Sequence, residues 1–159
     1  MHGFFLQLSA SLFGRLLTIT LIARRSRLYA GARLLKRGLC EHGDVANEVE
    51  VEQIVSDGER GSLHEGAMTA AVQMRGSIPL VWGHGEQKHM VPRPDIHLQS
   101  IDPRYEWTLR HFDDLHRRYG GPLFVFDLIR QAERRPRETI LGRGLADALA
   151  ALQASTRWT

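Results

Sequence analysis

The stretch from residue 17 to residue 53 constrains the fold most, because it joins an apolar run, a cationic run and an alternating run. The apolar run, 16–22, is rich in Leu, Ile and Thr and lies between Gly14 and Arg24. This composition predicts a strand buried on both faces. The run is too short to cross a bilayer as a helix. We therefore expect a strand of a folded domain here.

The alternating run follows a turn at 42–44, where Gly43 permits a tight change of chain direction. From 45 to 55, every second side chain faces the same side of an expected strand. One side is mostly Val, and the other carries the carboxylates of Glu48, Glu50 and Glu52. Glu50 and Glu52 could form a catalytic acid pair, but three carboxylates on one face are more typical of a surface that meets solvent or a partner.

A cationic segment lies between these two runs. The first 40 residues hold seven Lys or Arg and no Asp or Glu, whereas the remainder holds 14 basic and 18 acidic residues. Such a surface indicates an anionic partner, which could be a phosphate, a lipid headgroup or nucleic acid. The alternative is a solvated face that is partly neutralised by the three glutamates. The candidate substrate-binding residues of the segment are Arg24, Arg25, Arg27, Arg33, Lys36 and Arg37.

Arg75 is a further candidate, because it precedes Gly76 at the end of a second apolar stretch, 67–74. It could contact a phosphate or form a structural pair with a carboxylate. Nucleic acid is the least favoured partner, because no recognised binding motif accompanies the charge and the aromatic residues are not interleaved with the arginines. We therefore expect no nucleic-acid partner.

The second half of the chain alternates strand and helix signals. A short strand is expected at 96–99, and Asp102 with Pro103 is typical of a helix start. Apolar residues then recur at helical spacing until Gly120, which predicts the helix end. The residues of this apolar stripe are Tyr105, Leu109, Phe112, Leu115 and Tyr119.

A nearly continuous apolar run, 123–129, has the pattern of a central parallel strand. A final helix is expected from about Pro136, although Gly142 and Gly144 weaken its middle. Its expected buried residues are Ile140, Leu141, Leu145, Leu149 and Leu152. The order of elements favours an α/β fold with a mixed sheet flanked by helices.

A family resemblance is carried by five segments: TLIARRSR (20–27), AGARLLKRG (30–38), GDVANEVEVEQI (43–54), RGSIPLVW (75–82) and HFDDLHRRYG (111–120). Together they resemble the Sac-domain phosphoinositide phosphatases, in particular the polyphosphoinositide phosphatase branch that acts on phosphatidylinositol 3,5-bisphosphate. The resemblance covers residues 2–152, with small departures at 32, 51 and 83–84. It implies that residues 1–159 are an incomplete front portion of a Sac phosphatase domain.

The resemblance also implies a phosphatase chemistry for which this chain lacks the residues. Enzymes of the family are expected to attack phosphorus with a cysteine thiolate and to clamp the phosphate oxygens with an arginine six residues later. The one cysteine here is Cys40, and Ala46 stands six residues beyond it. We therefore assign no catalytic residue and predict that the 159-residue chain alone is inactive.

Metal and cofactor sites are not expected in this chain. His84 and His89, like His111 and His116, are five residues apart, which misses the spacing of three or four that a helical metal pair requires. A single cysteine also excludes a zinc site with several cysteines. Magnesium is a candidate cofactor only for a full-length family member.

The expected partners follow from the resemblance: a phosphoinositide headgroup or an anionic membrane surface, and a complex of a lipid kinase with a scaffold. The expected location is cytoplasmic and peripheral on endosomal or vacuolar membranes, without a transmembrane segment. The alternative function is a non-catalytic phosphoinositide-binding or scaffold module. The acid-free N-terminus is also typical of a targeting peptide, but the resemblance begins near His2 and treats these residues as part of the fold.

Overall fold

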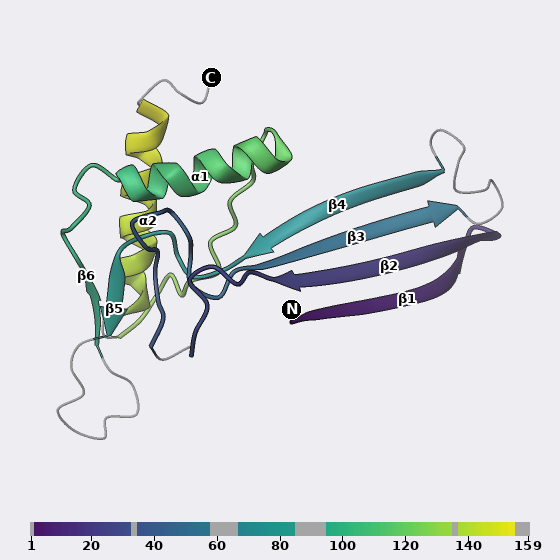
Figure 1. Ribbon diagram of the computed structural model, residues 1–159, viewed down its shortest axis with the longest axis horizontal. Helices are drawn as coiled ribbons and strands as arrows, with labels where there is room; N and C mark the ends of the chain where they lie inside the picture. Colours follow the sequence, from purple (N-terminus) through teal and green to yellow (C-terminus); the bar gives the residue numbers. More distant parts are fainter. Residues whose placement is uncertain (1, 33–34, 58–66, 85–94, 135–136, 155–159) are drawn as a thin grey trace. The chain divides into compact units, whose positions relative to one another are not determined.

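The chain forms two compact units in the computed structural model, which describes residues 2–32, 35–57, 67–84, 95–134 and 137–154. The sheet unit comprises residues 1–27 and 48–76, and the helical unit comprises residues 28–47 and 77–159. The described residues form a four-stranded sheet, a two-stranded sheet and two helices (Figure 1). The predicted α/β class is therefore confirmed.

The sheet unit is an antiparallel sheet in the order β1-β2-β3-β4 (Figure 1). The first hairpin turns at Phe13 and Gly14, which both have positive φ, of 50° and 75°. Two successive residues with positive φ match the right-handed twist of the strands that they join. The strands are β1 (Gly3–Leu12), β2 (Arg15–Arg25), β3 (Val49–Asp57) and β4 (Met68–Arg75).

The strand predicted at 16–22 is present as β2, but it is longer and only half-buried. It pairs with β1 on one side and β3 on the other, and residues 17–23 keep intermediate exposure. The prediction of burial on both faces was wrong. In an antiparallel sheet, the neighbouring strands satisfy the backbone hydrogen bonds of a central strand, and its two faces need not both be covered. The N-terminal residues pair with β2 along all of β1, so they are part of the sheet.

The strand predicted at 45–55 begins later than expected. Asn47 has a positive φ of 57° and turns the chain, so β3 starts at Val49. Val45 and Ala46 are instead buried in the helical unit, where Val45 bridges Leu39. From Val49 onward the predicted alternation of faces is confirmed.

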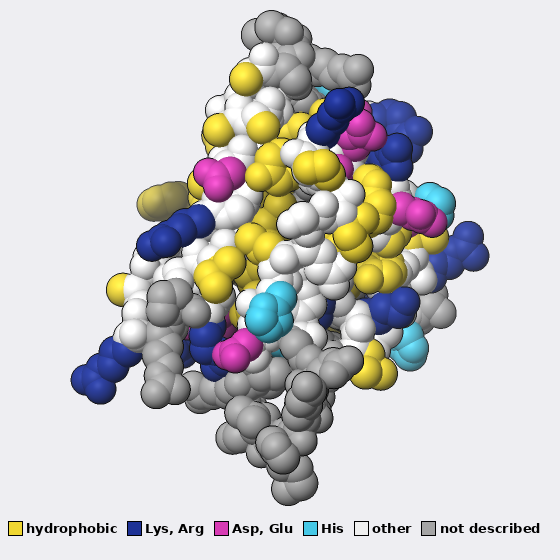
Figure 2. Space-filling view, turned by 90° about the vertical axis from the view of Figure 1, so that its left-hand side faces the viewer, with side chains coloured by type: hydrophobic (Ala, Val, Ile, Leu, Met, Phe, Trp, Pro, Cys, Tyr) yellow, Lys and Arg dark blue, Asp and Glu magenta, His cyan; other side chains and the backbone are white. Residues whose placement is uncertain are grey.

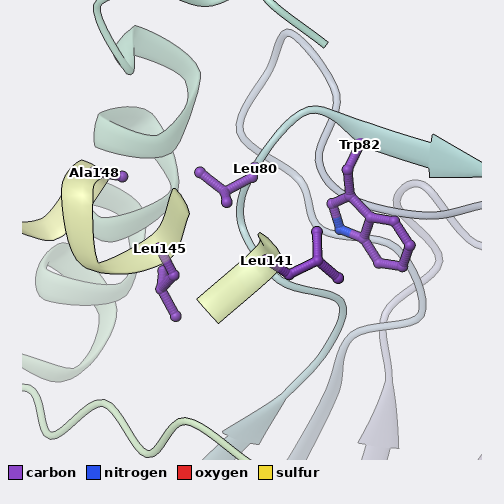
Figure 3. Packing of buried hydrophobic residues seen from close by; sticks show 5 residues of the cluster. All are labelled: Leu80, Trp82, Leu141, Leu145 and Ala148. Carbon is purple, nitrogen blue, oxygen red and sulfur yellow. The ribbon is translucent and has the colours of Figure 1, made fainter. Parts of the chain in front are cut away.

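The helical unit has an apolar core between α2 and the chain around β5. Its sheet consists of β5 (Trp82–His84) and β6 (Ile96–Leu98), and its helices are α1 (Glu106–Tyr119) and α2 (Glu138–Ala154). Gly144 is buried, and an added Cβ there would lie 3.0 Å from the side chains of Leu80 and Leu98. The glycine that weakens helix propensity therefore allows close packing. The core residues are Leu80, Trp82, Leu141, Leu145 and Ala148 (Figure 3).

Both helices are capped by a carboxylate that lies several residues upstream. Asp102 accepts hydrogen bonds from the backbone N–H groups of Glu106 and Trp107, each at 2.8 Å. The predicted capping role is confirmed, but α1 begins only after Tyr105, which has a positive φ of 55°. At α2, Glu133 accepts hydrogen bonds from three successive backbone N–H groups, those of residues 137, 138 and 139.

The central parallel strand predicted at 123–129 is absent from the described residues. The segment forms neither a helix nor a strand, and most of its side chains are exposed. The pairings between described strands are all antiparallel. The prediction was wrong for this chain because a strand requires neighbours as well as an apolar composition.

Candidate functional site

The predicted basic residues fall in both units, and each group has its own surroundings. Arg24, Arg25, Arg27 and Arg75 belong to the sheet unit, whereas Lys36 and Arg37 belong to the helical unit. Arg33 lies outside the described residues. The one cationic segment in the sequence is thus two structural groups.

The register of the sheet places Arg24 and Arg25 on opposite faces. Arg24 lies opposite Glu50 on β3. Arg25 lies opposite Val49, which in turn lies opposite Arg75 on β4. Because cross-strand neighbours share a face, one face carries Arg24 with glutamates, and the other carries two arginines on either side of a valine.

Arg24 is held by two carboxylates. Its guanidinium donates to Glu50 Oε1 at 2.6 Å and to Glu52 Oε2 at 2.7 Å. The hydrogen bond to Glu52, followed by that to Glu50, raises the pKa of Arg24 above its usual value. The negative charge of two carboxylates exceeds the positive charge of one guanidinium. The positive charge of Arg24 is therefore compensated and does not attract an anion to this group.

Arg25 and Arg75 place two guanidinium groups on the opposite face of the sheet. Both side chains are exposed, and both stand where their strands end. Two backbone hydrogen bonds fix the end of β2. The N–H of Arg25 donates to the His2 carbonyl at 3.0 Å, and the N–H of Ser26 donates to the Glu48 backbone carbonyl at 2.9 Å. Arg27 is also exposed and follows directly. Exposed guanidinium groups on an ordered strand end can bind a phosphate or an anionic surface.

Lys36 and Arg37 each lie against an aromatic ring in the helical unit. Lys36 Nζ lies 4.6 Å from the centre of the Tyr29 ring, and the Arg37 guanidinium carbon lies 5.5 Å from the centre of the Trp82 ring. The Tyr29 hydroxyl donates to the Arg37 carbonyl at 3.4 Å. These cation–π contacts orient both cations. The contact between Arg37 and Trp82 is not predictable from the sequence, because the two residues are 45 positions apart and meet only through tertiary packing.

Cys40 stands beside a tight turn. Its N–H donates to the Asp44 carbonyl at 3.0 Å, and its carbonyl accepts from the N–H of Gly43 at 2.9 Å. The thiol lies 3.8 Å from Asp44 Oδ2. Cys40 is thus a cysteine that flanks a turn and forms no disulfide.

His111 contacts the same turn from α1. Its Nδ1 lies 3.1 Å from the Gly43 carbonyl oxygen. Burial lowers the pKa of His111, and the hydrogen bond to Gly43 opposes this in part. Gly43 has a φ of 89°, and an added Cβ would lie 2.9 Å from Arg110 Cβ. The histidine and the glycine together hold α1 close to the turn, which is a structural role.

Other kinds of site find little support in the described ranges. No three His, Cys, Asp or Glu side chains there come together as metal ligands would. No helix among the same residues is long and apolar enough to cross a membrane. On the face in Figure 2, hydrophobic side chains gather in the middle, and Lys and Arg side chains are scattered toward the margin. The described residues therefore form no continuous cationic patch on that face.

Comparison with known proteins gives consistent matches. The SacI homology domain family matches residues 1–158. Over 156 residues, the chain is 51% identical to a phosphatidylinositol-3-phosphatase, SAC1, of Arabidopsis thaliana, which covers 98% of this chain and 17% of the relative. A phosphoinositide phosphatase of the same plant, SAC3, is 49% identical over 93% of this chain and 18% of its own length. A polyphosphoinositide phosphatase of Schizosaccharomyces pombe is 45% identical over 88% of this chain and 18% of its own length. The chain thus spans less than a fifth of the length of these relatives.

Proposed function

The chain belongs to the SacI homology domain family, and on that basis we propose that it is one portion of a phosphoinositide phosphatase. The observation that carries the proposal is the 51% identity, over 98% of the chain, to a protein named as a phosphatidylinositol phosphatase. The whole enzyme would hydrolyse a phosphate monoester of a phosphatidylinositol phosphate. Its Cys-x5-Arg loop would lie outside residues 1–159, because the one cysteine in this range has Ala46 at the sixth position beyond it.

Phosphatidylinositol 3,5-bisphosphate is the substrate that we propose. The match to a protein named polyphosphoinositide phosphatase supports a substrate with more than one phosphate on the ring. The relative named phosphatidylinositol-3-phosphatase supports the monophosphate as the competing substrate. Magnesium would be the cofactor of the whole enzyme, which would act on endosomal or vacuolar membranes in a complex with a lipid kinase and a scaffold.

The contribution of the sheet unit would be to bind a phosphoinositide headgroup or an anionic membrane. Arg25, Arg27 and Arg75 are exposed at or just beyond strand ends, and Arg25 and Arg75 share the face of the sheet opposite to that of Arg24. The same feature supports the second candidate function, a non-catalytic phosphoinositide-binding or scaffold module. Catalysis by the whole protein distinguishes the two.

The first experiment measures phosphate release from vesicles that contain either the 3-phosphate or the 3,5-bisphosphate lipid. It compares the 159-residue chain with a chimera in which this chain replaces the matching region of the Arabidopsis relative. We expect no release by the chain alone and preferential release from the bisphosphate by the chimera. Release of phosphate by the chain alone would contradict the proposal that the Cys-x5-Arg loop lies outside residues 1–159. A well-folded chimera without activity on either lipid would favour the binding module.

The second experiment measures binding of the 159-residue chain to vesicles with and without phosphoinositide. The double variant Arg25→Gln/Arg75→Gln should bind about thirty-fold more weakly, because each basic residue at an anionic surface contributes about 1 kcal/mol. The control is Arg104→Gln/Arg143→Gln, which removes the same charge from two exposed positions of the helical unit. Equal loss in both double variants would mean that binding depends on net charge rather than on this strand end.

A further inference from the structure

Residues 123–129 have the exposure pattern of a strand that lacks its neighbours. Phe124, Phe126 and Leu128 are 78%, 82% and 94% exposed, whereas Leu123 and Ile129 are partly buried. Because alternate side chains of an extended chain face opposite sides, these residues form an outer row, 124, 126 and 128, and an inner row in which Val125 is 47% exposed and Asp127 is also exposed. Ile129 packs against the core of the helical unit. The inner row is thus covered only at its ends, and the outer row is three large apolar side chains in water.

The backbone of this segment is equally incomplete. Within the described ranges, residues 123–128 make no backbone hydrogen bond to another residue. The backbone N–H of Ile129, the next residue, donates to Asp127 Oδ1 at 2.8 Å. Gln131 also donates to Asp127, at 3.2 Å. The end of the segment is thus fixed next to the core, while its middle offers unpaired donors and acceptors. The light-green trace after α1 in Figure 1 shows this part without an arrow.

The missing partner must supply both hydrogen bonds and apolar cover. A membrane could cover the phenylalanines, but it cannot pair with backbone amides. A polypeptide strand supplies both at once. Apart from Asp127, both rows are apolar, which is typical of a strand buried on both faces of a larger sheet. Because the chain spans less than a fifth of the length of its relatives, the rest of such a protein is a ready source of that strand.

We propose that residues 123–129 are a strand of a larger sheet, completed by an extended segment of the full-length protein that lies outside residues 1–159. Apolar side chains of that part cover Phe124, Phe126 and Leu128. The inference rests on the family membership of the chain and not on the identity of its lipid substrate.

Hydrogen exchange followed by mass spectrometry tests this docking strand in the isolated chain and in the chimera described above. We expect amides 124–128 to exchange at least about a hundredfold more slowly in the chimera, because paired strand amides exchange only when the structure opens. A peptide from α2 serves as the internal control and should be protected in both proteins. Equal exchange of 124–128 in both proteins would overturn the inference. The readout does not involve lipid hydrolysis, so it can fail or succeed independently of the phosphatase assay.

Two further measurements test whether a membrane or a second copy of the chain covers residues 123–129 instead. Protection of 124–128 in the isolated chain by anionic vesicles of phosphatidylcholine and phosphatidylserine, or on raising the protein concentration, would overturn the inference in favour of a membrane or a second copy. Phe126→Asp should lower the melting temperature of the chimera and leave the isolated chain unchanged. Phe13→Asp, at a side chain that is 97% exposed in the β1–β2 turn, is the matched control and should change neither.

A chimera in which the α2 peptide is not protected has not folded. In that case the 159-residue chain and the remainder of the Arabidopsis relative are mixed as separate chains. Protection of 124–128 on mixing supports the inference. Mixing without binding, or binding that Phe126→Asp does not weaken, overturns it.

Discussion

β2 and the segment 123–129 are both short, strongly apolar runs, yet only β2 forms a strand. β2 pairs with β1 from Arg15 to Arg24 and with β3 from Leu17 onward. The segment 123–129 pairs with no strand among the described residues, and Leu128 within it is 94% exposed. The two runs are similar in composition and differ in their neighbours. Strand formation is therefore decided by the partners that the chain brings alongside, and composition only makes a run suitable for pairing.

The largest effect that separates the two runs is expected from proline. Leu21→Pro should abolish the cooperative unfolding of the sheet unit, because residue 21 lies between Leu6 and Gln53 and proline cannot donate to a ladder. Val125→Pro in the isolated chain should leave the melting temperature within about 2 °C of the original, because no ladder is lost. Circular dichroism melts of both variants measure this difference. A large loss of stability in Val125→Pro would show that the segment is paired in solution.

A smaller effect is expected from truncating leucines. Leu145 is 5% exposed in the core of the helical unit, so Leu145→Ala should lower the free energy of unfolding by about 2–5 kcal/mol. Leu128→Ala removes the same atoms from an exposed position and should change it by less than about 0.5 kcal/mol. Urea denaturation followed by tryptophan fluorescence measures both. Similar losses in the two variants would mean that the outer row of 123–129 is covered in the isolated chain.

Prediction of the fold from sequence succeeded where local chemistry decides and failed where neighbours decide. The Asp102 cap and the Gly120 helix end were predictable, because each depends on residues within a few positions. The start of β3 was missed, because a positive φ at Asn47 redirects the chain and valines on either side of it belong to different units. The same limit explains the wrong prediction for 123–129.

The candidate site shows the same division. The sequence predicts a dense group of cations, and their role in substrate binding stays a prediction. It does not predict that strand alternation separates Arg24, bound to Glu50 and Glu52, from Arg25. The direction of each side chain follows from the register, which depends on where β3 begins. A one-residue change of register would exchange the two faces.

The smallest effect concerns the helix that follows the exposed segment, and it asks whether 123–129 depends on its flanks. Glu133 accepts hydrogen bonds at the start of α2, and the one from the Arg137 N–H contributes most to lowering the pKa of Glu133 below its ordinary value of 4.5. A carboxylate with a lowered pKa stabilises the fold above its ordinary pKa, and that stabilisation is lost as the pH falls through the lowered value. The first turn of α2 should therefore fray below pH 4.5. Glu133→Ala should fray it at neutral pH, and Glu133→Gln, which keeps an acceptor oxygen, should do so less.

Hydrogen exchange resolves this fraying from the behaviour of the neighbouring segment. In Glu133→Ala, amides at the start of α2 should exchange faster, while amides 124–128 should exchange at the same fast rate as in the original chain. That outcome would mean that the middle of the segment receives no support from α2, and that its missing contacts must come from elsewhere. Faster exchange of 124–128 together with α2 would show that the helix already protects the segment, and the contrast with β2 would then be one of degree.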